Sequence, residues 1–255
     1  MPIEAVVFDL DDTLIFEEEV ARASFRAIAE QIGAGPAAGE ALRERVRECW
    51  RAGPYWPMCM DLGISSWEGL WSDFSGCHPT LDELRRWIPH YRRTAWRRAL
   101  DALAVEAMDP EAIAGDYVRL QSNGHGLRPG AAPILEALRP RHPIGLLTNG
   151  PPDIQRLKVE KNALAGYFES IAISGEIGAG KPDAGAFGHV LKELDVVPEA
   201  AVMIGDSWER DVIGADTTGM RAIWVSNGRP VPEHRPQVTV IDSVASLLGH
   251  PLLFA

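Results

Sequence analysis

Acidic residues crowd the segment DLDDTL, which directly follows a short apolar run over residues 5–8. Alternate residues of an extended chain point the same way, so Asp9 and Asp11 could share one pocket beyond the run. Two carboxylates this close repel each other unless a cation or a proton separates them, and clustered oxygen ligands suit a hard ion such as Mg²⁺. The pair therefore predicts a magnesium site. The alternative is a solvated turn after a strand.

A second acidic group follows another apolar run. Asp206 comes just after residues 201–204, and Asp211 stands five residues further along. These carboxylates could complete an oxygen-ligand metal site with Asp9 and Asp11. The alternative for Asp206 is a helix N-cap, a position that favours Asp.

Two further segments offer groups for phosphate oxygens. The segment LLTNG places Thr148 and Asn149 directly after an apolar run. A hydroxyl, an amide and backbone N–H groups at this point can donate to an anion. The alternative is a simple turn, which Thr-Asn-Gly also favours. Lys181, in GEIGAGKPD, can bring one positive charge to the edge of the sheet. The alternative is a surface lysine. That segment nearly matches the phosphate-binding pattern G-x4-G-K-[ST]. Pro182 replaces the Ser or Thr that would reach Mg²⁺, so this pattern is rejected.

Five apolar runs rich in Val and Ile are expected to be the strands that position these residues. They are Ala5 to Phe8, Ile144 to Leu147, Ser170 to Ile173, Ala201 to Ile204 and Ala222 to Val225. Such runs suit strands buried on both faces of a parallel sheet. Helix-like segments separate the last four: Pro152 to Leu164, Ala184 to Leu194 and Trp208 to Thr218. The alternation predicts a Rossmann-like, doubly wound α/β fold, in which the strand C-termini share one ligand-binding edge.

The segment between the first two runs is too long for a single crossover and reads almost wholly helical. Its expected helices are Glu17 to Gln31, Gly39 to Arg51, Ser66 to Phe74, Leu81 to Leu103 and Pro110 to Gln121. An all-helical insertion after the first strand predicts a second domain over the sheet edge. We therefore expect an α/β core from residues 1–16 and 123–255 and a helical cap from residues 17–122, with hinges near residues 15–18 and 123–126.

Composition limits the function classes. The 255 residues carry a net charge of −11, which argues against binding to nucleic acid polymers or to an anionic membrane. The start, MPIEAVVFDLDDTL, does not read as a signal peptide, and no window approaches the ~20 apolar residues of a membrane span. The three cysteines, Cys49, Cys59 and Cys77, match no metal-ligand spacing and are expected to be reduced thiols in a cytoplasmic protein. The sequence predicts no oligomeric state.

Taken together, the four motifs resemble the haloacid dehalogenase (HAD) superfamily, in particular its phosphatases with a helical cap after the first strand. DLDDTL matches the nucleophile motif, LLTNG the threonine motif, GKPD the lysine motif and GDSWERD the acidic motif. The resemblance covers residues 1–16 and 124–229, and the insertion matches only in position and type. Residues 146–187 look most like the pyrimidine 5'-nucleotidase and N-acylneuraminate 9-phosphatase group.

The resemblance implies a role for each motif residue. Asp9 would be the nucleophile that forms an aspartyl-phosphate, and Asp11 would protonate the leaving group and then take a proton from water. Mg²⁺ would be held by the Asp9 carboxylate, the Asp11 main-chain carbonyl and Asp206. Asp211 would be a ligand, directly or through water, or would orient one.

The remaining motif residues would serve the phosphoryl group and its loop. Thr148 and Asn149 would bind phosphoryl oxygens. Lys181 would neutralise the developing charge and steady Asp9. Thr13 would hydrogen-bond near Asp11 and hold the loop.

The implied function is a Mg²⁺-dependent phosphomonoesterase for a small phosphorylated metabolite, either a nucleoside monophosphate or a sugar phosphate. Dehalogenases of the superfamily lack an acid at the position of Asp11. Phosphonate-cleaving members use a cap lysine, and residues 17–122 contain no Lys. A phosphosugar mutase would keep all four motifs and stays open. A catalytically idle binding or regulatory module is the other alternative, which the intact Asp9, Asp11, Lys181 and Asp206 disfavour.

The predicted cap is rich in aromatic and basic residues. Six of the eight tryptophans lie there and are expected to pack its helices, with stacking on a base or sugar as the alternative: Trp50, Trp56, Trp67, Trp71, Trp87 and Trp96. Six arginines of residues 81–103 are expected to form a solvated face, with recognition of an anionic substrate as the alternative: Arg85, Arg86, Arg92, Arg93, Arg97 and Arg98. His78, His90 and His125 are interpreted as structural.

Overall fold

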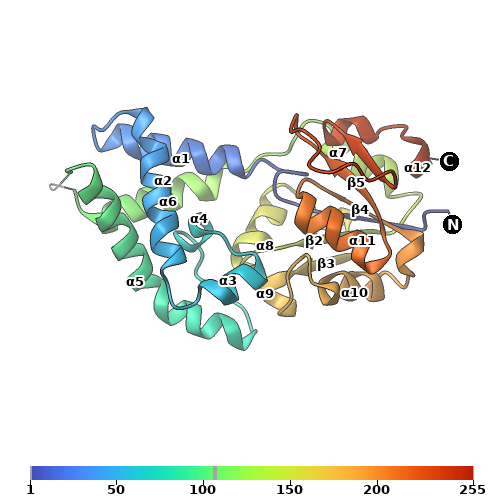
Figure 1. Ribbon diagram of the computed structural model, residues 1–255, viewed down its shortest axis with the longest axis horizontal. Coiled ribbons are helices and arrows are strands. Elements are labelled where there is room, and N and C mark those ends of the chain that lie inside the picture. The colour runs from blue at the N-terminus through green and yellow to red at the C-terminus, as the bar shows by residue number, and fades with distance from the viewer. Residues whose placement is uncertain (1, 106–107, 255) are drawn as a thin grey trace.

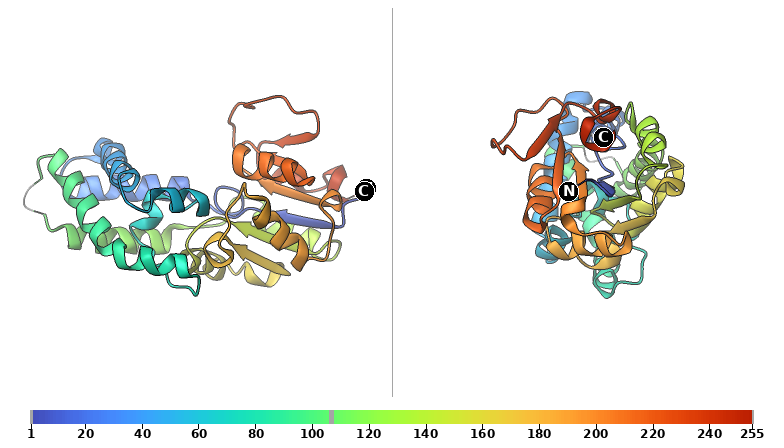
Figure 2. Two further views of the ribbon diagram at one scale, coloured as in Figure 1. Left: turned by 60° about the horizontal axis from the view of Figure 1, so that its bottom comes forward. Right: turned by 90° about the vertical axis from the view of Figure 1, so that its right-hand side faces the viewer.

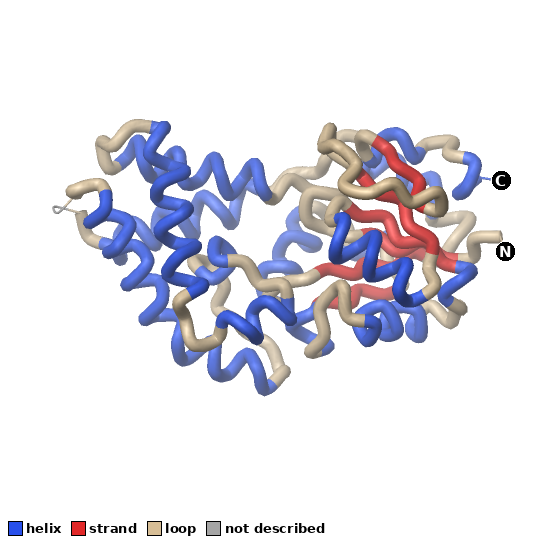
Figure 3. Tube along the Cα trace, viewed as in Figure 1, coloured by secondary structure: helices blue, strands red, loops and turns tan. Residues whose placement is uncertain are grey.

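The computed structural model describes residues 2–105 and 108–254. A helical part and a part built on a sheet lie side by side along the long axis of the molecule, and both termini lie at the sheet end (Figure 1). Every strand belongs to one end of the molecule, whereas the other end is helical (Figure 3). None of the helices among the described residues is long and apolar enough to cross a membrane.

The sheet has six parallel strands in the order β3-β2-β1-β4-β5-β6. The strands are β1 (Ala5–Phe8), β2 (Ile144–Thr148), β3 (Ser170–Ile173), β4 (Ala201–Gly205), β5 (Arg221–Val225) and β6 (Val238–Ile241). The predicted α/β fold class is confirmed, and five strands lie where the sequence predicts them. The sixth, β6, was missed because it is a partly exposed edge strand that follows a Pro-rich stretch.

Burial on both faces explains the continuous apolar runs. Val6 and Phe8 of β1 pack in one hydrophobic cluster, and Ala5 and Val7 pack in another on the opposite face. Helices cover both faces: α7 (Ala131–Leu138), α8 (Pro152–Lys161), α9 (Ser174–Ile177), α10 (Ala184–Glu193), α11 (Gly214–Thr218) and α12 (Pro251–Phe254). Short 3₁₀ turns span Pro36–Ala38, Ala165–Tyr167, Pro198–Ala200 and Val244–Leu247, and a π-helical turn spans Trp208–Ile213.

The register brings the motif-bearing strand ends together. Phe8 of β1 is opposite Leu146 of β2 and Ile204 of β4, so the residues after all three strands emerge at one edge. The backbone N–H of Asp9 donates to the carbonyl oxygen of Ile204 at 2.9 Å and extends this pairing by one residue. The chain between β5 and β6 forms a long loop that projects from the body of the molecule (Figure 2).

In the described part of the insertion between β1 and α7, six α-helices make up the helical part. They are α1 (Glu18–Gln31), α2 (Gly39–Arg51), α3 (Trp56–Leu62), α4 (Ser66–Gly69), α5 (Pro79–Ala102) and α6 (Pro110–Gly124). The prediction missed α3 because Gly53 to Pro57 reads as a breaker; Pro57 lies in the first turn of α3, where a missing N–H costs nothing. The helix expected over residues 66–74 was too long, since α4 ends at Gly69.

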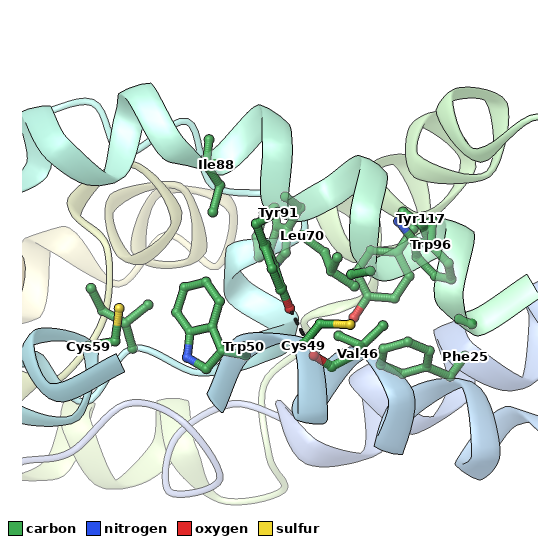
Figure 4. Packing of buried hydrophobic residues seen from close by; sticks show 14 of the residues in the cluster. Phe25, Val46, Cys49, Trp50, Cys59, Leu70, Ile88, Tyr91, Trp96 and Tyr117 are labelled. Atoms are coloured by element: carbon green, nitrogen blue, oxygen red, sulfur yellow. Dashed lines mark hydrogen bonds between the residues drawn. The ribbon is translucent and has the colours of Figure 1, made fainter. Parts of the chain in front are cut away.

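Aromatic side chains fill the core of the helical part (Figure 4). Trp50 packs against Tyr91 and Trp96 packs against Tyr117, and both tryptophans are fully buried. The Tyr91 hydroxyl donates to the Ser66 carbonyl at 2.8 Å. These tryptophans therefore pack helices together, as expected. Arg85 and Arg92 depart from the expected solvated face, because their guanidinium groups donate to backbone carbonyls of residues 69–76.

The two parts make polar contacts with each other. Ser174 of α9 donates to the carbonyl of Leu62 at 2.6 Å, and Ser72 donates to Asp153 of α8 at 2.8 Å. Gly63 ends α3 with φ +68°, and a Cβ at this position would lie 2.3 Å from Nδ2 of Asn149. A glycine is therefore needed at residue 63 for the close approach of the helical part to the sheet edge.

Candidate active site

An ion-paired cluster joins the first, third and fourth motifs at the sheet edge. Nζ of Lys181 lies 2.5 Å from Oδ1 of Asp9 and 2.7 Å from Oδ1 of Asp211. All three residues are buried. Lys181 was expected beside Asp9, whereas its second contact, with Asp211, was not expected.

The end of β4 is built to hold Asp211 and Asp206. Asp211 lies in the π-helical turn, and its Oδ2 accepts from the backbone N–H of Ser207 at 2.9 Å. A Cβ on Gly205 would lie 2.2 Å from that same oxygen, so a glycine is required there. The Asp206 carboxylate pairs with Arg229 at 3.0 Å. The N-cap of the turn is Ser207, so the alternative of Asp206 as N-cap is wrong.

Thr148 offers a hydrogen-bonding group that has no partner among the described residues. Its Oγ1 is buried, and Thr148 lines the cavity at the sheet edge. A buried hydroxyl without a partner costs free energy, and a ligand oxygen would satisfy it.

Asn149 is engaged differently from the expectation. Its Oδ1 accepts from the Lys181 backbone N–H at 2.8 Å and its Nδ2 donates to the Lys181 carbonyl at 2.9 Å. The Asn149 side chain therefore fixes the backbone that carries the lysine. This geometry favours a positioning role over direct contact of its amide with phosphate.

The Thr13 hydroxyl does not hold the loop after β1, since it is buried and has no partner within the described part of the chain. The hydrogen bond that Thr13 makes near Asp11 comes from its backbone N–H, which donates to the carbonyl of Leu10 at 3.3 Å. Asp12 holds the loop instead: its carboxylate accepts from the backbone N–H groups of Glu17 and Glu18 and lies 3.2 Å from Arg128. A carboxylate with several donors holds a loop more firmly than one hydroxyl does.

Asp11 contacts two residues that the sequence reasoning did not single out. Nζ of Lys158 lies 2.9 Å from Oδ1 of Asp11, and Nε2 of Gln155 donates to Oδ2 at 2.9 Å. Both residues come from α8. Their spacing of three places them on one helix face, which the sequence could have indicated, but the packing of that face against the β1 loop is set by the tertiary fold.

Further acids from the start and middle of the helical part surround Lys158. Glu17 lies 2.7 Å from Nζ of Lys158 and 2.7 Å from Nε2 of His125, and it accepts from Trp67 at 2.8 Å. Glu68 lies 4.0 Å from the same Nζ. His125, interpreted from sequence as structural with no partner, thus contacts Glu17.

A cavity of about 410 Å³ opens at this edge between the two parts. Its lining from the sheet part includes Asp9, Asp11, Thr148, Asn149, Lys181, Asp206, Asp211, Trp208, Arg210 and Arg229. Its lining from the helical part and its start includes Glu17, Glu18, Gly63, Ser65, Trp67 and Glu68. Of the cap tryptophans, Trp67 therefore contributes to the cavity wall.

Burial and crowding raise the pKa of Asp9 and of Asp206 at the sheet edge. Burial raises the pKa of Asp9 well above its ordinary value; Lys181 opposes this change, and Asp211, Asp206 and Asp11 reinforce it. Burial and the charge of Asp211 raise the pKa of Asp206 to about 7, against the pull of Arg229. The site thus holds more carboxylates than its own cations balance.

The acids around Lys158 differ in pKa. Burial raises the pKa of Glu17, but Lys158 and the hydrogen bond from His125 outweigh burial and bring it to about 2. Burial raises the pKa of Glu68 to about 7, opposed by Lys158 and reinforced by Glu17 and Asp11. Burial likewise raises the pKa of Asp11, against Lys158.

The donor set at the sheet edge fits a hard divalent cation. Carboxylate oxygens of Asp9, Asp206 and Asp211 all lie within 4.8 Å of one another. Oxygen-only ligands of this kind suit Mg²⁺, and a cation there would relieve the crowding that raises the pKa values of Asp9 and Asp206.

The chain belongs to a known hydrolase family. The model of the haloacid dehalogenase-like hydrolases matches residues 3–217. The predicted family is thereby confirmed, as is the prediction of an enzyme of the hydrolase class.

Individual relatives support this membership. The chain is 35% identical over 243 residues to a phosphoserine phosphatase of Thermus thermophilus, covering 94% of this chain and 96% of the relative. It is 28% identical to the N-acylneuraminate-9-phosphatase of Mus musculus over 242 residues, covering 90% and 85%. Among solved structures, the HAD hydrolase YfnB of Bacillus subtilis superimposes with a TM-score of 0.69 at 19% identity, covering 98% of each chain, which supports the fold.

Proposed function

We propose that this protein is a Mg²⁺-dependent phosphomonoesterase that acts on a small phosphorylated metabolite through an aspartyl-phosphate. The observation that carries the proposal is the buried cluster in which Lys181 contacts Asp9 and Asp211, together with the Thr148 hydroxyl, which has no partner among the described residues. This cluster combines a nucleophile, a positive charge and a hydrogen-bond donor. The phosphatase relatives support the reaction class.

In the proposed reaction, a carboxylate oxygen of Asp9 forms a bond to phosphorus while the ester P–O bond breaks. The Thr148 hydroxyl would donate to a phosphoryl oxygen, and the Lys181 ammonium would offset negative charge as it develops. The contacts from Asn149 to the Lys181 backbone hold that ammonium in place before substrate arrives. Binding and orientation of the phosphoryl group thus need no rearrangement of these side chains.

Asp11 is the proposed acid and base. It would give a proton to the leaving alkoxide in the first step. In the second step it would take a proton from the water that attacks phosphorus, which regenerates free Asp9 and releases phosphate. The raised pKa of Asp11 favours the protonated form that the first step needs.

Mg²⁺ would be held by carboxylates of Asp9 and Asp206 and the main-chain carbonyl of Asp11, with Asp211 as a direct or water-mediated ligand. When bound, the ion supplies positive charge that screens the repulsion between a carboxylate and a phosphoryl group. We propose that residues 17–122 act as a cap that shuts water out of the cavity while substrate is bound.

The cavity favours a small substrate. A volume of about 410 Å³ suits a metabolite, and the wall from residues 17–68 presents carboxylates, a hydroxyl and an indole. Such a wall suits a substrate that carries hydroxyl or ammonium groups beside its phosphate. Sugar phosphates, nucleoside monophosphates and phosphoserine all meet this description.

The test is metal-dependent release of phosphate from purified protein. The panel holds phosphoserine, pyrimidine and purine nucleoside monophosphates, sugar phosphates and N-acylneuraminate 9-phosphate, each with Mg²⁺ and with EDTA. Asp9→Asn, which preserves size and polarity, is the control variant. We expect release that needs Mg²⁺ and vanishes in Asp9→Asn. Isomerised sugar phosphate without release would support the mutase, and no turnover by wild-type protein would support a binding module.

A further inference from the structure

The most buried lysine of the molecule outside the proposed metal-binding cluster contacts Asp11. Lys158 lies on α8, and its side chain is 1% exposed. A buried ammonium is costly unless carboxylates surround it. Here Nζ lies 2.9 Å from Oδ1 of Asp11 and 2.7 Å from Oε2 of Glu17.

Gln155, three residues earlier on α8, holds the other oxygen of Asp11. Its Nε2 lies 2.9 Å from Oδ2 of Asp11, 2.8 Å from the carbonyl oxygen of Asn149 and 3.3 Å from Oε1 of Glu68. Both carboxylate oxygens of Asp11 thus accept from one helix face. Two such donors fix the rotation of the carboxyl group about its bond to Cβ.

Glu17 anchors Lys158 from the start of the helical part. Glu17 directly precedes α1, and His125, which directly follows α6, contacts it at 2.7 Å. Trp67 donates to the other oxygen of Glu17 at 2.8 Å. The position of the Lys158 ammonium is therefore set by the two segments that connect the helical part to the sheet part.

Lys158 does not line the cavity but contacts two residues that do, Asp11 and Glu17, and of these two only Asp11 has a proposed part in the reaction. The described residues that line the 410 Å³ cavity include Asp11 but neither Lys158 nor Gln155. The Asp11 side chain is 22% exposed and lines the cavity, while Lys158 and Gln155 hold its two oxygens from outside the cavity lining. Lys158 and Gln155 are thus placed to hold the Asp11 carboxyl group, the proposed proton donor, in one orientation.

We propose that Lys158, anchored by Glu17, is a positioning residue that holds the Asp11 carboxyl group in the orientation needed for proton transfer to the leaving group. The proposal rests on the phosphatase function proposed above. If Lys158 acts in this way, its loss should slow the reaction of substrates whose leaving group needs a proton from Asp11. It should have little effect on substrates whose leaving group needs no proton. A merely structural residue would affect all substrates alike.

Leaving groups of different basicity separate these roles. An alkyl phosphate such as phosphoserine or a sugar phosphate releases a basic alkoxide that needs a proton, whereas p-nitrophenyl phosphate releases a stable phenolate that does not. The ratio kcat/KM reports the steps up to the first irreversible one, here phosphoryl transfer to Asp9, so it excludes the later hydrolysis.

The experiment compares kcat/KM for both substrates in wild-type protein and in Lys158→Met, which keeps the length of the side chain without its charge. We expect kcat/KM to fall about 10- to 100-fold for the alkyl phosphate and less than about threefold for p-nitrophenyl phosphate. Lys161→Met is the matched control from the same helix. Lys161 is exposed and contacts residues 122 and 123, so both substrates should retain wild-type values within about twofold.

Removal of Lys158 leaves the buried acids Glu17 and Glu68 and the half-buried Asp11 near one another and can impair folding. The double variant Glu17→Gln/Lys158→Met removes one of those charges together with the lysine, and it should show the same selective loss. Equal losses for both substrates, or no loss for either, in a variant with wild-type circular dichroism and Tm would overturn the proposal. If wild-type protein hydrolyses neither substrate, the phosphatase function fails first and this proposal with it.

Discussion

The ammonium of Lys181 lies 2.5 Å from Oδ1 of Asp9, although 172 residues separate them in the chain. β1 and β2 pair in parallel, and the Asn149 side chain at the end of β2 fixes the Lys181 backbone beside Asp9. Lys181 also contacts Asp211, so one cation serves two carboxylates. Arg229 pairs with Asp206, so two cations face three carboxylates at this edge before a phosphoryl group adds its charge. This excess of negative charge is the basis for assigning Mg²⁺ to this edge.

The Thr148 hydroxyl lines the cavity and is available to a phosphoryl oxygen, because it has no partner among the described residues. Thr148→Val removes the hydroxyl while keeping the shape of the side chain. A lost hydrogen bond to a phosphoryl oxygen should lower kcat/KM about 5- to 150-fold, from about 1–3 kcal/mol. Stability should not fall, because the hydroxyl has no partner among the described residues. Steady-state kinetics and thermal unfolding check both expectations, and unchanged kcat/KM would remove Thr148 from the site.

Asp206→Asn should weaken Mg²⁺ binding. The variant keeps an oxygen ligand but loses the negative charge, and a loss of at least about tenfold in affinity is expected. Isothermal titration calorimetry measures the affinity directly. Asp101→Asn, an exposed site on α5, is the control and should bind Mg²⁺ as wild type does. An unchanged affinity in Asp206→Asn would show that the assigned metal site is wrong.

The raised pKa of Glu68 predicts how stability depends on pH. A carboxyl group whose pKa rises from 4.5 to about 7 on folding holds its proton more tightly in the folded state. The stability that this carboxyl group contributes to the folded state is fully present below pH 4.5 and is lost as the pH rises through 7. Glu68→Gln keeps a side chain that suits the capping box with Ser65 and removes this loss.

The Tm of Glu68→Gln relative to that of wild type should therefore grow from pH 5 to pH 8. The increase should be about 2–4 °C for each kcal/mol of unfolding free energy that wild type loses over this range and the variant keeps. Thermal unfolding at the two pH values measures it. Glu83→Gln, at an exposed position on α5, should give the same difference at both pH values. A Tm difference for Glu68→Gln that stays constant or shrinks as the pH rises would contradict the assignment.

Short-range patterns were enough to predict the sheet edge. Asp9, Thr148 and Asp206 each follow a continuous apolar run, and buried parallel strands bring the ends of such runs together. The β6 strand was missed because its side chains are only partly buried, so its pattern is weak. The length of α4 was missed because an apolar segment can continue after its helix has ended.

The contacts of Asp11 could not be predicted in this way. Lys158 and Glu17 are each unremarkable in the sequence, and their meeting depends on how α8 packs against the start of α1. Arg229 contacts Asp206 from a loop after β5 that carries no chemical motif. The part of Asp12 in holding the loop was missed, because the residues whose N–H groups its carboxylate accepts, Glu17 and Glu18, come near it only in the folded loop.

The central claim is that Asp9 becomes phosphorylated. Asp11→Asn should still transfer the phosphoryl group from p-nitrophenyl phosphate, since that leaving group needs no acid, but should hydrolyse the intermediate slowly without its base. Mass spectrometry of this variant after mixing with Mg²⁺ and p-nitrophenyl phosphate is the most direct measurement. We expect one added phosphoryl group, on the peptide that contains Asp9, and none in Asp9→Asn/Asp11→Asn. A phosphoryl group on another residue, or turnover with Asp9 never modified, would contradict it.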